Sequence, residues 1–72
     1  MQRDIRIFFK DNTIKDIKDI YQYNIYHKAN EIEILSQKDY LYSYSLNDIS
    51  QIIITTKLEN QNWATTNDFI IF

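Results

Sequence analysis

The chain has 72 residues and no cysteine, and ten acidic against eight basic side chains give a net charge of −2. This length predicts a single small domain covering residues 1–72, and the lack of cysteine excludes disulfides and thiolate metal sites. A single histidine leaves no zinc site, no basic stripe indicates a nucleic-acid partner, and no apolar run reaches the roughly 18 residues that span a membrane. We therefore expect no metal, no cofactor and no membrane association.

Residues 5–10 alternate apolar and other side chains, which predicts a first strand. Asp11-Asn12 then predicts a turn, because asparagine tolerates positive φ in a chain without glycine. Residues 13–20 are ambiguous. Ile14, Ile17 and Tyr21 have helical spacing, but the segment also suits a hairpin partner for the first strand, followed by a bend at residues 18–19. We favour the strand.

Two more strands are predicted over residues 21–27 and 31–35, with a turn at residues 28–30 between them. In the second of these, Ile32 and Ile34 alternate with Glu31 and Glu33, so one face is apolar and the other acidic. Residues 38–39 predict a tight turn into the next strand.

The stretch from residue 40 to residue 56 organises the predicted sheet. Tyr40, Tyr42, Tyr44 and Leu46 share one face of a strand, one helical turn is expected within residues 45–50, and an isoleucine run follows at residues 52–54. A run that is apolar on both sides suits a central strand.

We predict a mainly β fold, an antiparallel meander of four to five strands curved into a small partial barrel or sandwich, with at most a short helix. The side chains predicted to be buried are Ile7, Ile25, Ile34, Tyr42 and Ile53.

The pattern weakens after Lys57 and ends in the apolar segment DFIIF. Trp63, Phe69 and Phe72 are expected to close one end of the core or to lie across one face of the sheet.

Several large apolar side chains point away from the predicted core. Either the C-terminal segment covers them and makes a second layer, which we favour, or a partner does. The candidate partner-binding residues are Phe8, Tyr26, Glu31, Glu33, Leu35, Leu41 and Trp63. Residues 4–10 and the terminal DFIIF also suggest edge strands without obvious protection, which would allow pairing with a partner's sheet or a homodimer.

Six tyrosines allow a second interpretation, a small domain that binds single-stranded nucleic acid by stacking its bases on tyrosine rings. Placement of the tyrosines in or beside the core is favoured, because the clustered basic residues that accompany stacking are missing. The chain has no cysteine that could act with His27 as a catalytic pair, and no serine or acidic partner for His27 is evident in the sequence. We therefore expect no enzymatic activity.

Residues 5–55, which include the segments KDNTIKDI and YSYSLNDISQIII, resemble a pattern in small accessory proteins of Firmicute phages and mobile elements. Asp11-Asn12-Thr13 and residues 46–49 occupy its two turns, with Asn12 in place of the usual glycine. Some small phage proteins of this size are anti-defence inhibitors, including anti-CRISPR proteins. The resemblance implies a phage-type accessory protein. Because the chain is small, has no chemistry-bearing motif and has surplus apolar and edge-strand surface, we expect a non-enzymatic inhibitor in the cytoplasm of a bacterial host, which occludes a host protein such as a nuclease or defence component. The alternatives are the nucleic-acid-binding domain and a self-assembling structural dimer.

Overall fold

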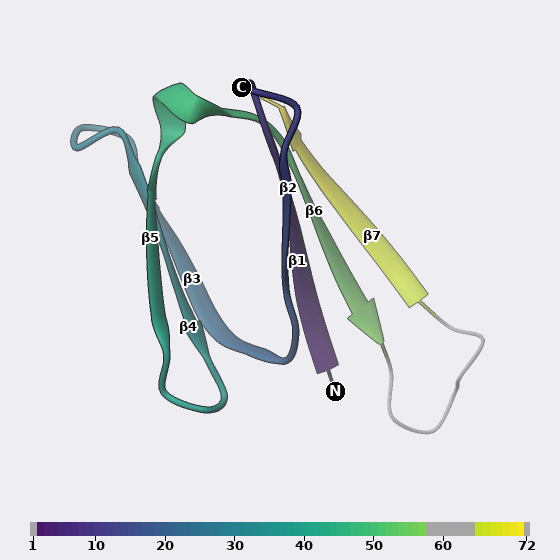
Figure 1. The fold of residues 1–72 in the computed structure, drawn as a ribbon. Helices are drawn as coiled ribbons and strands as arrows, with labels where there is room; N and C mark the ends of the chain where they lie inside the picture. Colours follow the sequence, from purple (N-terminus) through teal and green to yellow (C-terminus); the bar gives the residue numbers. More distant parts are fainter. Residues whose placement is uncertain (1, 58–64, 72) are drawn as a thin grey trace.

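Seven antiparallel strands and one turn of 3-10 helix make up the part of the chain that the computed structural model describes, residues 2–57 and 65–71 (Figure 1). The prediction of a mainly β antiparallel fold with a short helix is confirmed. In chain order the elements are β1 (Gln2–Phe9), β2 (Ile14–Ile17), β3 (Ile20–Tyr26), β4 (Glu31–Ser36), β5 (Leu41–Ser45), η1 (Leu46–Asp48), β6 (Ile49–Lys57) and β7 (Thr65–Ile71).

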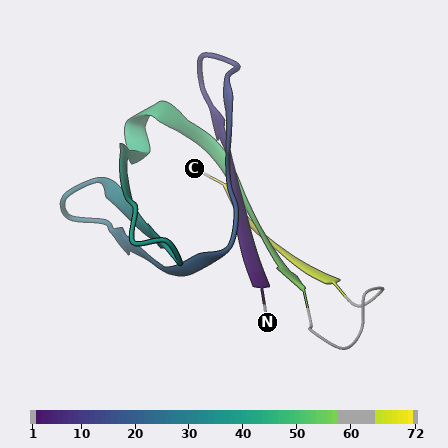
Figure 2. The ribbon, with the colours of Figure 1, turned by 60° about the horizontal axis from the view of Figure 1, so that its bottom comes forward.

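The strands form two sheets, a four-stranded sheet of order β2-β1-β6-β7 and a three-stranded sheet of order β3-β4-β5. Only the three-stranded sheet is a simple meander. The chain passes from the first sheet to the second between β2 and β3, and returns through η1 to place β6 beside β1 (Figure 1). Viewed from another side in Figure 2, the two sheets face each other as an open sandwich that does not close into a barrel.

The ambiguous segment after the first turn is a strand, as favoured, because β2 pairs with β1 as a hairpin. The turn uses its polar residues locally: the Asp11 carboxylate accepts hydrogen bonds from the backbone N–H of Thr13 at 2.9 Å and from its hydroxyl at 2.5 Å. The backbone N–H of Phe9 donates a hydrogen bond to the Thr13 carbonyl at 2.9 Å. The turn is therefore closed by side-chain and main-chain hydrogen bonds together.

Positive φ angles mark the turns of this glycine-free chain. They occur at Asn12, Asp19, Asn30 and Asp39, with φ between 53° and 71°. Asparagine and aspartate adopt this left-handed conformation more easily than other residues with a side chain. The predicted turns and the bend at residues 18–19 are therefore confirmed.

Asn30 offers a direct test of this turn chemistry. Its φ is 55°, and a β-branched residue is strongly disfavoured in that region. We expect Asn30→Val to lower the free energy of unfolding by about 1–2 kcal/mol, whereas Asn30→Gly should leave it nearly unchanged. Urea denaturation of the two variants measures the difference; equal losses would show that the Asn30 side chain, and not its backbone conformation, is what matters.

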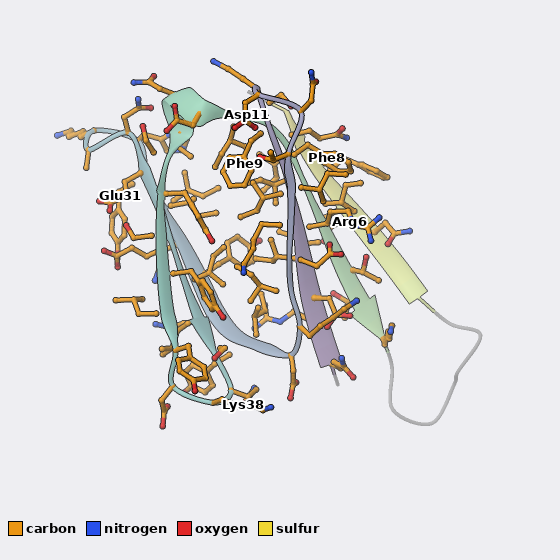
Figure 3. The ribbon with its side chains drawn as sticks, in the orientation of Figure 1. Arg6, Phe8, Phe9, Asp11, Glu31 and Lys38 are labelled. Atoms are coloured by element: carbon orange, nitrogen blue, oxygen red, sulfur yellow. The ribbon has the colours of Figure 1, made fainter. Side chains whose placement is uncertain are left out.

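The core lies between the two sheets and consists almost entirely of isoleucine. The fully or nearly fully buried apolar residues are Ile5, Ile7, Ile17, Ile20, Ile32, Ile34, Leu46, Ile49, Ile52 and Ile54. They come from β1, β2 and β6 on one side and from β3 and β4 on the other, with Leu46 contributed by η1. Figure 3 shows side chains filling the space between the ribbons.

Burial is confirmed for Ile7 and Ile34 and is partial for Ile25 and Tyr42, which pack against the core. The prediction for Ile53 is wrong. Ile52 and Ile54 point inward and are buried, so Ile53 between them lies half-buried on the opposite face of the sheet. The prediction that Tyr40 belongs to the tyrosine strand is also wrong, because β5 begins at Leu41 and the Tyr40 ring is exposed.

The two predicted edges have different outcomes. The segment at residues 4–10 is no edge, because β1 pairs with β2 on one side and with β6 on the other. The terminal segment is an edge: β7 extends the four-stranded sheet beside β6 and does not form a layer over an outer face. The expectation that Phe69 closes the core is wrong, since its side chain is exposed, while Trp63 and Phe72 lie outside the described residues.

Candidate functional site

The outer face of the three-stranded sheet collects most of the predicted partner-binding residues. In β4 the burial alternates, so that Ile32, Ile34 and Ser36 point to the core and the residues between them point outward. The strand register then aligns Tyr26 with Glu31 and Leu35 with Leu41 on that outward side. The nine outward positions are Gln22, Asn24, Tyr26, Glu31, Glu33, Leu35, Leu41, Ser43 and Ser45. We call them the acidic outer face.

The acidic outer face combines exposed apolar groups with negative charge. Leu41 is 64% exposed and Tyr26 44%, while Glu31 and Glu33 are half-exposed between them. The hydroxyl of Ser43 donates a hydrogen bond to the Glu31 carboxylate, which orients that carboxylate across two strands. None of the nine residues is lysine or arginine. The face therefore suits a partner surface that carries basic and apolar groups.

Phe8 and Trp63 do not belong to this face. Phe8 lies on the outer side of the four-stranded sheet, and Figure 3 shows Phe8 and Glu31 on opposite sides of the molecule. Trp63 lies outside the described residues. Of the seven residues predicted from the sequence, five share one surface and a sixth lies on the opposite sheet.

The outer side of the four-stranded sheet carries a second group of apolar side chains. Phe8 pairs with Ile14 across β1 and β2, and Ile53 pairs with Phe69 across β6 and β7. Ile14 is 55% exposed and Phe69 60%. Of these residues the sequence analysis identified only Phe8 as outward, although the isoleucine run of β6 already indicated a strand that is apolar on both faces.

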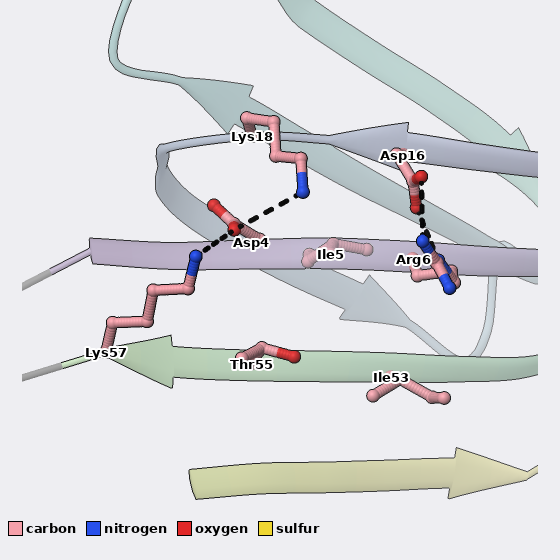
Figure 4. A pocket seen from close by; sticks show the side chains of 8 residues that line it. All are labelled: Asp4, Ile5, Arg6, Asp16, Lys18, Ile53, Thr55 and Lys57. Carbon is pink, nitrogen blue, oxygen red and sulfur yellow. Dashed lines mark hydrogen bonds and ion pairs between the residues drawn. The ribbon is translucent and has the colours of Figure 1, made fainter. Parts of the chain in front are cut away.

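Charged residues occupy the other half of that outer side and line a hollow of about 250 Å³ (Figure 4). Asp4 is at its centre, only 8% exposed. Its carboxylate accepts hydrogen bonds from the Asp19 backbone N–H at 2.9 Å and from the Gln2 amide at 3.0 Å. Lys18 and Lys57 each place Nζ 3.7 Å from the same carboxylate. These four interactions converge on the Asp4 carboxylate, which is the arrangement of a structural network.

Asp4 stays ionised because its partners outweigh its burial. Burial raises the pKa of Asp4, but the hydrogen bond from Asp19, the one from Gln2 and the charges of the two lysines together bring that pKa below its usual value. In the same region Arg6 forms a bidentate pair with Asp16, at 2.7 and 3.1 Å, and its hydrogen bond lowers the pKa of Asp16. Neither carboxylate is poised to exchange protons near neutral pH.

Three of the six tyrosines pack against the core. Tyr23, Tyr42 and Tyr44 pack against it, and the Tyr44 ring contacts Phe9 edge-on with the centroids 5.3 Å apart. Burial raises the pKa of Tyr44, with a smaller contribution from Tyr42. The rings of Tyr21, Tyr26 and Tyr40 are exposed. On the acidic outer face the only ring is Tyr26, beside two glutamates, a setting that repels phosphate.

A pocket of about 560 Å³ opens between the β1–β2 turn and η1. Its lining includes the rings of Phe9 and Tyr44 and the carboxylates of Asp11 and Asp48.

Within residues 2–57 and 65–71, no group of three or more His, Cys, Asp or Glu side chains is placed to hold a metal ion. His27 is exposed in the β3–β4 turn. No helix among these residues is long and apolar enough to cross a membrane.

The acidic outer face therefore contains more of the residues predicted to bind a partner than any other described surface. It brings together exposed apolar side chains and two carboxylates on adjacent paired strands. Such a surface can bind a macromolecule that carries basic and apolar groups. No protein-family model, no curated protein and no solved structure matches this chain.

Proposed function

We propose that this protein is a non-enzymatic binding protein whose acidic outer face occludes a surface of a host protein. The observation that carries the proposal is the placement of Tyr26, Leu35 and Leu41 around Glu31 and Glu33 on one exposed sheet face. The exposed apolar groups of this face supply affinity, while the carboxylates select a partner with basic residues.

The chemistry of the face favours a particular class of target. Nucleases and other defence components that bind nucleic acid present basic surfaces, and an acidic face can occupy them. We propose further that the protein is an anti-defence inhibitor of the anti-CRISPR type, encoded by a phage or mobile element and acting in the cytoplasm of a bacterial host. Blocking a surface in this way requires no chemistry of the inhibitor's own.

Capture from a Firmicute host lysate with tagged protein, followed by mass spectrometry, tests the proposal. We expect one enriched protein with a basic surface. Its recovery should fall at least tenfold when Leu41→Asp or Glu33→Lys is used as bait. The first change replaces an exposed apolar contact of the acidic outer face with a charge, and the second reverses a charge on its middle strand. Far-UV circular dichroism of each bait confirms that the variant is folded.

Ile14→Asp is the matched control. Ile14 has an exposed aliphatic side chain like Leu41, but it lies on the other sheet, so this variant should retain the partner. Equal loss with Ile14→Asp and Leu41→Asp would place the binding surface elsewhere. A mobility shift with mixed-sequence single-stranded DNA or RNA that Tyr26→Ala abolishes would replace protein binding with nucleic-acid binding.

A further inference from the structure

We propose that β7 pairs antiparallel with β7 of a second copy, so that two four-stranded sheets join into one continuous sheet. This goes beyond the binding role of the acidic outer face, because it concerns the opposite sheet and a different partner. It rests on the contrast between β7 and the other edge strands, on where β7 lies, and on the residues that self-pairing would bring together.

The described part of the chain has four edge strands, β2 and β7 in one sheet and β3 and β5 in the other. Natural edges are protected by shortness, charge or irregular pairing. β2 has four residues and carries Lys15 and the Arg6-bound Asp16, β5 has only five residues, and the pairing of β3 shifts register between Ile20 and Gln22.

β7 has none of these protections. It has seven residues, it pairs with β6 in an unbroken register, and its sequence TTNDFII contains a single charge and neither lysine nor proline. A regular strand of this kind presents unpaired N–H and C=O groups along one side, and these favour addition of another strand.

Within residues 2–57 and 65–71, no strand lies beyond β7 in its sheet. In Figures 1 and 2, β7 lies at the side of the four-stranded sheet that is farthest from the three-stranded sheet. Strand order agrees, since β6 and β1 separate β7 from the β2 edge. A second copy docked at β7 would therefore leave both acidic outer faces open.

Self-pairing has a preferred register. In an antiparallel pair related by a twofold axis, one residue faces its own copy. If that residue were Asp68, two carboxylates would lie directly opposite, which is unfavourable. If it is Phe69, two exposed rings meet, and Asp68 faces an isoleucine of the second copy. Aromatic cross-strand pairs stabilise antiparallel sheets.

The Phe69-centred register also continues an existing apolar row. Phe69 lies beside Ile53 on the outer side of the sheet, and it is 60% exposed. Pairing about Phe69 would extend this row from Ile53 through both phenylalanines to the second copy's Ile53. The seam would thus bury apolar surface in addition to forming main-chain hydrogen bonds, in a closed dimer with the commonest oligomer symmetry.

The absence of cysteine from the 72-residue chain allows a clean crosslinking test. Residues directly opposite in an antiparallel pair have Cβ atoms close enough for a disulfide, whereas diagonal neighbours are farther apart. We expect Phe69→Cys to form a disulfide-linked dimer under mild oxidation at least severalfold faster than Asp68→Cys. Sedimentation of the wild-type chain should give twice its mass of 8.8 kDa.

Ile14→Cys is the matched control, because Ile14 is also exposed on the outer side of the same sheet but lies on its other edge. It should crosslink slowly. Equal rates for Ile14→Cys and Phe69→Cys would indicate face-to-face or random encounters, and faster crosslinking of Asp68→Cys would indicate the other register. The second result would overturn the Phe69-centred register but keep the pairing of β7 with β7. The first result, or a monomeric wild-type chain at the highest soluble concentration, would overturn the proposal.

Discussion

Ile52→Ala should lower the free energy of unfolding by about 2–5 kcal/mol, through the lost transfer free energy of the side chain and the cavity that remains. Ile52 is fully buried between the sheets, on the central strand β6. A domain of 72 residues has little stability in reserve, so this variant should be largely unfolded at room temperature. Urea denaturation followed by circular dichroism measures the loss.

Ile53→Ala is the control for that prediction. The substitution is chemically identical and one residue away, but Ile53 is half-buried on the outer side of the sheet, so we expect a loss of only about 1 kcal/mol. Equal losses at the two positions would mean that the outer side is covered as completely as the core.

The second large effect is expected at Asp4. Asp4→Ala removes the acceptor for the Asp19 backbone N–H and the anion between Lys18 and Lys57. Because hydrogen bonds to charged groups contribute about 1.5–3 kcal/mol, we expect a loss of this order. Asp4→Asn retains an acceptor oxygen and should lose less. Asp16→Asn breaks an ion pair with Arg6 that is exposed to solvent, so it should cost much less than Asp4→Ala.

The same carboxylate makes stability depend on pH. The pKa of Asp4 is lower in the folded chain than the value of 3.8 for a free side chain. The folded state therefore binds fewer protons, and the contribution of the ionised group is complete above about pH 4 and is lost as the pH falls through the folded pKa. Acid titration of stability should be shallower in Asp4→Asn than in the wild type. An unchanged acid transition would assign it to Asp11 and Asp16, whose pKa values are also lowered.

The two proposed interfaces lie on different sheets, which has a functional consequence. A dimer joined at β7 would present two acidic outer faces, one from each three-stranded sheet. Two linked binding faces can engage a dimeric or repetitive target with greater avidity than one face, provided that the geometry permits both contacts. Dimerisation and inhibition would then reinforce each other and not compete for one surface.

Local features of the chain were readable from the sequence because they depend on neighbouring residues alone. Alternation in EIEIL predicts a strand with Glu31 and Glu33 on one face, and that is where they lie. Turns could be located at Asn12, Asn30 and Asp39, since few residues other than glycine tolerate positive φ. The outward positions of Tyr26, Leu35 and Leu41 followed from the same period of two.

Pairing between distant strands was decided only by the tertiary structure. No local sequence pattern predicts that β1 pairs with β6, whose paired residues lie 40 to 55 positions apart in the chain, or that the chain divides into two sheets after β2. In the run from Ile52 to Ile54, both alternating faces are apolar, so only the position of the three-stranded sheet determines which side is buried. The same long-range pairing separates Phe8 from Tyr26 and makes β7 an edge, because a strand's own residues specify its faces but not its neighbours.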